Sequence, residues 1–365
     1  MNRTLCLAHA VVIFMVTPAP AVDRAEPAPA RGLPFPPAFS VLDDVLQLPP
    51  PFGRGVPMLP PQQQPNQMNQ QRPRFGPWQG DVNVTVAGAD GTVTRLHTFE
   101  RAGVPTVARL KDGRLMAAFQ NFPKDDQANF DKVAVSFSAD EGKTWTTPAT
   151  MVITGMDQGL MRPFDPTLVP LPDGRVRMYF TSNRSPRFEE STPAIYSAIS
   201  EDGLHYTFEP GMRFGVEGKV VIDCAVCLHQ GVFHLFSPDN GTPAEMREEQ
   251  FPGRPRPASG LGYHATSKDG LNFERVPDVK IEGASNLRWL GNVLSDGTTM
   301  TFIGTGSATP RRGGLWMATS KTGTDWTLIE SPPSIVGADP GIVQLKDGTS
   351  LVVSTAIAVS GERTR

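Results

Sequence analysis

Ser138-Ala-Asp140-Glu-Gly142-Lys-Thr-Trp145 is the stretch that decides the fold, because shortened versions of it recur three times further along the chain. Each copy combines a serine, a tight turn with a glycine and an aromatic end, and each follows a short apolar segment with strand character. The later copies occupy residues 200–206, 267–273 and 320–326. In the best-preserved copy, Asp140 can bond backbone donors of its own turn while Trp145 packs between sheets, so we expect a structural role.

A second series of turns alternates with the first. Each member is preceded and followed by an apolar run, which is the signature of a β-hairpin. The series comprises Lys111-Asp-Gly113, Pro172-Asp-Gly174, His229-Gln-Gly231, Ser295-Asp-Gly297 and Lys346-Asp-Gly348. Two turn series on a repeat of about 50 to 60 residues give four strands per unit, which predicts an all-β propeller.

The ends of the repeat region predict how the ring closes. The chain stops two strands after Gly341, which leaves a fifth blade half built, while residues 82–86 and 92–99 form a spare hairpin at the other end. We therefore expect five blades, with the N-terminal hairpin completing the last one and covering its edge. This domain is expected to span residues 81–365.

The first 80 residues have a different composition. Residues 1–21 combine a short polar start, an apolar core and an Ala19-Pro-Ala21 site, which predicts a cleaved signal peptide and a secreted or periplasmic protein. Between Pro18 and Pro77 lie 16 of the 36 prolines, so residues 22–80 are expected to form a Pro/Gln-rich disordered linker. The 34 basic and 37 acidic residues provide no cationic field for nucleic acid, and no segment is long and apolar enough to span a membrane. We expect a monomer.

Three aspartates stand at corresponding places in the repeat. Asp165, Asp223 and Asp339 each open an inner strand, and their spacing follows the repeat period. Because equivalent positions of a propeller converge on its axis, the three carboxylates are expected to meet on the face opposite the Ser138–Trp145 turn and its three copies. Convergent carboxylates are what hydrolysis of a glycosidic bond requires, since one donates a proton while another activates water. The alternative is that the Asp-Pro pairs only start strands as turn residues.

The series Asp165-Pro-Thr, Ile-Asp223-Cys and Ile-Glu282-Gly-Ala resembles the Asp, Asp, Glu series of five-bladed glycoside hydrolases. That group is glycoside hydrolase family 43, which includes arabinanases and β-xylosidases. The resemblance implies that Asp165 is the general base, Asp223 the residue that tunes the acid's pKa, and Glu282 the general acid. The Ser295-Asp-Gly297 turn, however, aligns Arg288 rather than Glu282 with the inner-strand start. From the three aspartates and this resemblance, the protein is expected to be a secreted hydrolase of glycans.

Two other functions stay open. The Ser138–Trp145 element resembles the Asp box of sialidases, whose family implies a cluster of arginines that binds a substrate carboxylate. A non-catalytic propeller that binds glycans or proteins is the third possibility. We expect no required cofactor and no catalytic metal, although a structural or axial Ca²⁺ is compatible with the acidic cluster. Substrate-binding side chains are expected at Arg162, Arg288, Trp289, Arg311, Arg312 and Asp339, with Trp289 stacking on a sugar.

Cys224 and Cys227 are the cysteines that remain after the signal segment. Residues three apart on a strand face opposite sides of the sheet, so the pair is a poor metal site. Two core thiols or a local disulfide are expected instead.

Overall fold

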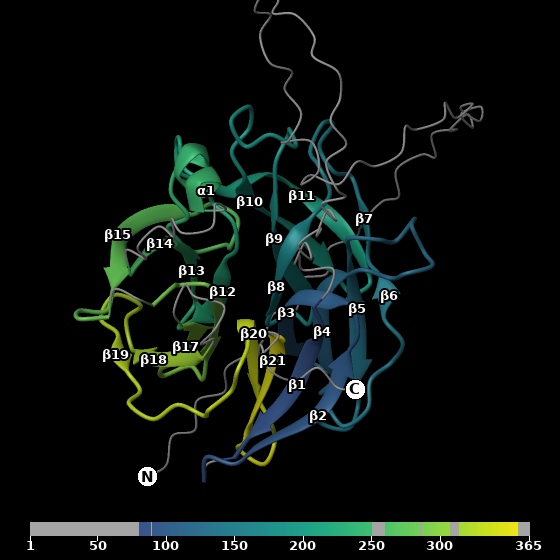
Figure 1. Ribbon diagram of the computed structural model, residues 1–365, viewed down its shortest axis with the longest axis vertical. Helices are drawn as coiled ribbons and strands as arrows, with labels where there is room; N and C mark the ends of the chain where they lie inside the picture. Colours follow the sequence, from purple (N-terminus) through teal and green to yellow (C-terminus); the bar gives the residue numbers. More distant parts are fainter. Residues whose placement is uncertain (1–79, 89, 250–259, 285–286, 307–313, 357–365) are drawn as a thin grey trace, which may run out of the picture. The chain divides into compact units, whose positions relative to one another are not determined.

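A computed structural model describes residues 80–88, 90–249, 260–284, 287–306 and 314–356. All of them belong to the second of the two units into which the chain divides, which spans residues 56–365. The expected signal segment and most of the expected linker lie outside the described residues. In the described part, the strands form five sheets around one axis, and the only helix found there, α1 (Pro243–Glu249), is too short to cross a membrane. The fold is a five-bladed β-propeller (Figure 1).

Blades 1 and 2 follow the expected strand order. In each of these blades the inner strand is followed in the sequence by its antiparallel partners, from the axis outward. Blade 2 carries a fifth strand, β7, which pairs in parallel with β11. Blade 1 consists of β3 (Ala102–Arg109), β4 (Leu115–Asn121), β5 (Lys132–Ser138) and β6 (Ala149–Thr150), and blade 2 of β8 (Phe164–Pro170), β9 (Val176–Ser182), β10 (Ala194–Ser200), β11 (His205–Phe214) and β7 (Val152–Thr154).

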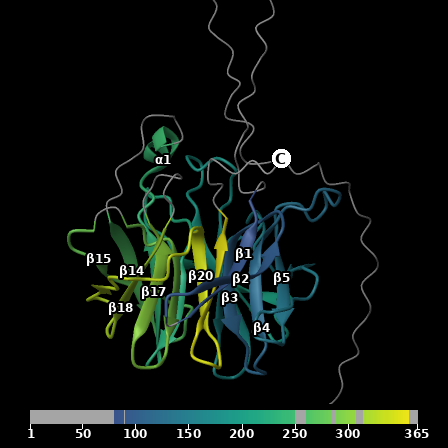
Figure 2. The ribbon, with the colours of Figure 1, turned by 60° about the horizontal axis from the view of Figure 1, so that its bottom comes forward.

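Blades 3 and 4 repeat the arrangement. Helix α1 lies in the connection between the second and third strands of blade 3 (Figure 2). Blade 3 consists of β12 (Ala225–His229), β13 (Val232–Pro238), β14 (Leu261–Ser267) and β15 (Glu274–Lys280), and blade 4 of β16 (Gly291–Ser295), β17 (Met300–Thr305), β18 (Leu315–Ser320) and β19 (Thr327–Leu328).

Blade 5 joins the two ends of the propeller sequence. Its inner strands are β20 (Ala338–Gln344) and β21 (Ser350–Thr355), and its outer strands are β1 (Val82–Ala87) and β2 (Val93–Phe99). Strand β1 pairs antiparallel with β21 from Val82 opposite Thr355 to Ala87 opposite Ser350. The yellow C-terminal strands therefore lie beside the blue N-terminal hairpin (Figures 1 and 2).

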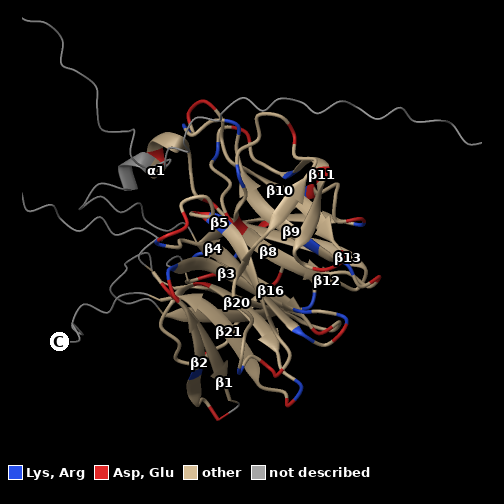
Figure 3. Ribbon diagram, turned by 90° about the vertical axis from the view of Figure 1, so that its right-hand side faces the viewer, with Lys and Arg blue, Asp and Glu red and all other residues tan. Residues whose placement is uncertain are grey.

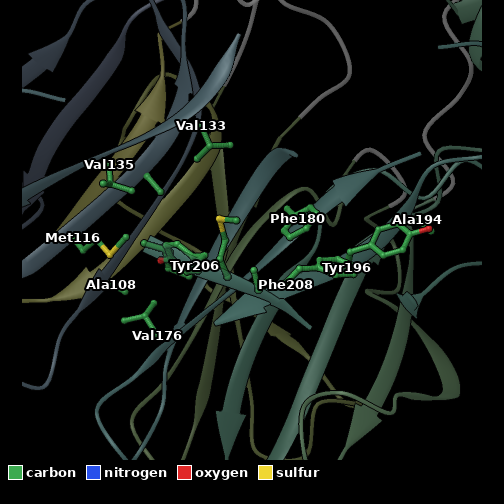
Figure 4. Close-up of a cluster of buried hydrophobic side chains, with 14 residues drawn as sticks. Ala108, Met116, Val133, Val135, Val176, Phe180, Ala194, Tyr196, Tyr206 and Phe208 are labelled. Carbon is green, nitrogen blue, oxygen red and sulfur yellow. The ribbon is translucent and has the colours of Figure 1, made fainter. Parts of the chain in front are cut away.

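The core lies between neighbouring blades. Five apolar clusters occupy the five interfaces, because each sheet buries side chains on both faces. The cluster between blades 1 and 2 is built around Met116, Phe180 and Tyr206, which are all less than 3% exposed (Figure 4). The strands are largely free of charge, and Lys, Arg, Asp and Glu concentrate in the turns and loops at the sheet ends (Figure 3).

The four repeated turns share one hydrogen-bond pattern. The serine hydroxyl of each turn accepts a bond from the turn glycine, at 2.9 Å for Ser138 and Gly142 and at 2.8 Å for Ser320 and Gly323. Asp140 accepts from the backbone and the hydroxyl of Thr144, and these bonds lower its pKa to about 2. Ser138 also pairs with Leu115, which opens the second strand of the blade. The repeated turns and the first hairpin turns therefore lie at one end of the blades, and the inner strands begin at the opposite end.

Candidate functional site

The starts of the inner strands build the candidate site. Asp165 lies at the start of β8, Asp339 at the start of β20, and Asp223 two residues before β12. Each has a left-handed backbone, with φ of 51°, 49° and 67° respectively. Non-glycine residues adopt this conformation rarely and at a cost, and strained residues of this kind concentrate at functional sites.

The three carboxylates influence one another, as expected from their equivalent positions. Burial and the nearby charges of Asp339 and Asp131 raise the pKa of Asp165 to about 8. Burial and the charges of Asp165 and Asp339 raise the pKa of Asp223 well above its ordinary value, against the attraction of Arg288. Burial also raises the pKa of Asp339 to about 6, although Arg288 and a hydrogen bond from Thr355 oppose the shift. The cluster therefore holds protons at neutral pH, and its members differ in charge.

Exposure differs among the three residues. Asp165 is 7% exposed, whereas Asp223 and Asp339 are half-buried. Burial is nevertheless the largest cause of the raised pKa of all three carboxyl groups.

Two arginines complete the cluster, and both are held by side chains that the repeat pattern did not identify. Arg162 forms an ion pair with Asp131, whose other oxygen accepts a bond from Gln120 at 2.8 Å. Arg288 donates to Oδ1 of Asn240 at 3.2 Å, and Asn240 is itself anchored on the carbonyl of Ile222. These partners fix the guanidinium groups beside the carboxylates.

Asp131 and Asn240 were missed because both lie in loops between the second and third strands of their blades. Loop lengths vary from blade to blade, so position within the repeat gives no signal there. One signal was available for Asp131, since a lone acid follows the apolar Phe130 directly before a strand.

Glu282 is not brought to this cluster. It is exposed, in a turn that follows β15, and the charges that shift the three aspartates are those of one another, Asp131, Arg162 and Arg288. The inner-strand start of blade 4 carries Arg288 instead, as the turn alignment indicated. The structure thus gives no support to Glu282 as the general acid.

The expectation that Trp289 offers a stacking surface for a sugar is wrong. Its side chain is 1% exposed and donates to the carbonyl of Gly260 at 3.1 Å. It packs edge-on against Phe302 and Trp316 and has Gly262 against its ring, because only a residue without a Cβ fits there. Trp289 is therefore a core residue between blades 3 and 4.

Other expected groups are placed as follows. Arg311 and Arg312 lie outside the described residues. Cys224 and Cys227 are buried free thiols, and burial raises the pKa of both. Among the described residues, no group of three or more His, Cys, Asp or Glu side chains is arranged to hold a metal ion.

Comparison with known proteins gives the fold a context. No protein-family model matches the chain, and no curated protein matches its sequence. An N-acetylgalactosamine deacetylase from F. plautii, in complex with blood group B trisaccharide, is 14% identical over 71% of this chain and 81% of that chain, with a TM-score of 0.50. An α-L-arabinofuranosidase from Lactobacillus brevis is 14% identical over 72% of this chain and 85% of that chain, also with a TM-score of 0.50.

A third similar structure is a family 43 β-xylosidase/α-arabinofuranosidase from a compost microbial metagenome. It is 16% identical over 72% of this chain and 88% of that chain, with a TM-score of 0.49. At these identities the likeness to the two structures with a TM-score of 0.50 shows a shared fold. The expected assignment to the arabinanase and β-xylosidase group stays a prediction.

Proposed function

We propose that this propeller is a glycoside hydrolase that cleaves glycosidic bonds with carboxylates at its axis. The observation that carries the proposal is the meeting of Asp165, Asp223 and Asp339 at equivalent inner-strand starts, where their charges perturb one another. Structural neighbours named as an arabinofuranosidase and as a carbohydrate deacetylase share the fold and support a carbohydrate ligand.

The cluster contains the two chemical functions that the reaction needs. Burial and like-charge repulsion keep a proton on part of the cluster, which provides a general acid for the leaving oxygen. The positive charge of Arg288 favours the ionised form of the remaining carboxylate, which provides a base for water. An acid and a base are thus present in one cluster at neutral pH.

The same contacts favour a neutral sugar over a sialic acid. A carboxylate clamp uses arginines whose charge is available to the substrate. Here Arg162 is paired with Asp131, and Arg288 contacts Asn240 and lies beside Asp223 and Asp339. An anionic substrate would therefore approach these carboxylates while both arginines already interact with groups of the protein.

A screen of the full-length protein against nitrophenyl furanosides and pyranosides tests the proposal. We expect hydrolysis of at least one neutral glycoside and, on the matching methyl glycoside, a loss of about 10²- to 10⁴-fold in kcat/KM for Asp165→Asn, which is isosteric. The matched control is Asp173→Asn at the other end of β8, where the exposed carboxylate only pairs with Arg175. Glycan binding without hydrolysis would leave the binding module as the better description. An Asp165→Asn protein as active as the control would show that the axial carboxylate of Asp165 does not take part in the reaction.

A further inference from the structure

Five equivalent positions surround the axis, one from each blade. Val104, Asp165, Arg288 and Asp339 each precede a hairpin-turn glycine by nine residues, and Asp223 precedes its glycine by eight. Val104 shares the left-handed backbone of the aspartates, with φ of 48°. In blade order the ring reads Val104, Asp165, Asp223, Arg288, Asp339, and neighbouring inner strands contact each other all the way round. The ring is therefore chemically asymmetric.

Asp339 occupies the side of the ring that stabilises a negative charge. Its neighbour in blade 4 is Arg288, whose charge acts on it directly. Oγ1 of Thr355 accepts a hydrogen bond from the backbone N–H of Val104 at 2.9 Å and is hydrogen-bonded to the Asp339 carboxyl. Oγ1 keeps its own proton for donation to Asp339, and this contact lowers the pKa of the carboxyl. This contact fits the ionised form of Asp339.

Asp165 occupies the opposite kind of environment. Its neighbours in the ring are the apolar Val104 and the acid Asp223, and the residue is 7% exposed. The negative charges of Asp339 and Asp131 act on it, and Arg162, the cation that acts on it, is paired with Asp131. Desolvation and repulsion both favour a protonated carboxyl at this position.

We propose that Asp339 is the general base of the hydrolase and that Asp165 is its general acid, with Asp223 between Asp165 and Arg288 as a positioning residue. This rests on the proposed function and reverses the role that family resemblance implies for Asp165. As the water oxygen bonds to the anomeric carbon, Asp339 takes a proton from that water. The bond from the anomeric carbon to the leaving oxygen breaks, and that oxygen receives the proton of Asp165. Solvent then restores one proton to Asp165 and removes one from Asp339.

The charge assignment is testable without any substrate. In full-length protein labelled with ¹³C at the aspartate carboxyl carbons, Asp165→Asn and Asp339→Asn identify the two resonances. At pH 7 we expect the Asp165 carbon at an acid shift and the Asp339 carbon at a carboxylate shift. Arg288→Met should raise the titration midpoint of Asp339 by about one pH unit, which corresponds to the loss of one nearby charge. Asp165 ionised at pH 7 while Asp339 is protonated would overturn the proposal, whether or not hydrolysis is ever observed.

Leaving-group dependence tests the roles once a hydrolysed glycoside is known. Dinitrophenolate departs without protonation, so Asp165→Asn should keep activity on a dinitrophenyl glycoside within about tenfold. The same variant should lose about 10²- to 10⁴-fold on the matching methyl glycoside. Asp339→Asn should lose activity on both, and added azide, which needs no base, should restore turnover of the dinitrophenyl substrate. The reverse pattern would show that Asp165 is the base. Wild-type protein that is inactive on all glycosides would contradict the proposed hydrolase function, and the ¹³C shifts alone would then show which aspartate is protonated.

Discussion

The backbone N–H of Val104 donates to Oγ1 of Thr355 at 2.9 Å, so the first inner strand of the propeller is tied to its last described strand. Two other strand starts repeat this contact with the preceding blade, at 3.0 Å from Asp223 to Thr181 and at 3.0 Å from Asp339 to Thr305. All three donors have a positive φ. A threonine hydroxyl of the neighbouring blade thus helps to hold each strand start in a conformation that side chains disfavour.

The left-handed backbone of Asp165 predicts an unusual order of stability for two variants that shorten its side chain. Asp165→Gly should be more stable than Asp165→Ala by about 1 kcal/mol, because glycine accepts φ of 51° while alanine pays for it. At Asp173, which does not have a positive φ, the glycine variant should be the less stable one. Urea unfolding of the four proteins measures both differences, and an alanine variant at position 165 as stable as the glycine variant would show that no strain is stored there.

The two buried histidines of blade 3 predict a loss of stability in acid. Nδ1 of His234 lies 3.1 Å from Nε2 of His264, and the two rings stack in the core. Burial, with the charge of His229 acting on His234 and that of His234 acting on His264, lowers the pKa of each from 6.5 to about 4. The unfolded chain therefore binds more protons than the folded one below pH 6.5, and stability falls as pH drops from 6.5 towards 4.

The expected decrease is on the order of 2 to 3 kcal/mol for each histidine, and about 5 kcal/mol for the pair, by pH 4.5. Thermal unfolding between pH 7.5 and 4.5 measures it, with His264→Gln as the non-titrating comparison. The variant should start from a lower melting temperature and lose less of it on acidification. Parallel curves for the two proteins would assign the acid sensitivity to other groups.

A buried ion pair lies within blade 2, and its arginine also contacts blade 3. Arg177 binds both oxygens of Glu209 at 2.8 and 2.9 Å and donates to the carbonyl of Asp269 in a repeated turn of blade 3. Its side chain is 7% exposed. Arg177→Met should cost about 3 to 5 kcal/mol, since Glu209 is left buried without its cation, and adding Glu209→Gln should recover part of that loss.

The Arg109–Glu141 pair provides the comparison, because its side chains are 24% and 25% exposed. Arg109→Met should cost about 1 kcal/mol in the same denaturation assay. Equal losses at the two sites would mean that burial does not set the strength of these pairs.

The repeat predicted the fold and the three aspartates for the same reason. Strand starts recur at fixed distances from hairpin glycines, so Asp165, Asp223 and Asp339 were identifiable by position alone. Asp131 and Asn240 were not, because they come from loops whose path depends on tertiary contacts. Trp289 was misread because its environment depends on Gly262 of the neighbouring blade, a contact that no local pattern contains.

Cleavage at the anomeric carbon by the axial carboxylates is tested most directly by isotope incorporation. The full-length protein is incubated with the methyl glycoside of the sugar that it hydrolyses in H₂¹⁸O, and the released sugar is analysed by mass spectrometry beside Asp165→Asn and Asp173→Asn. We expect one ¹⁸O at the reducing carbon of the sugar from the wild type and from Asp173→Asn, and little or no product from Asp165→Asn. Release of an unlabelled sugar, or equal labelled product from Asp165→Asn, would contradict glycosidic hydrolysis by these carboxylates.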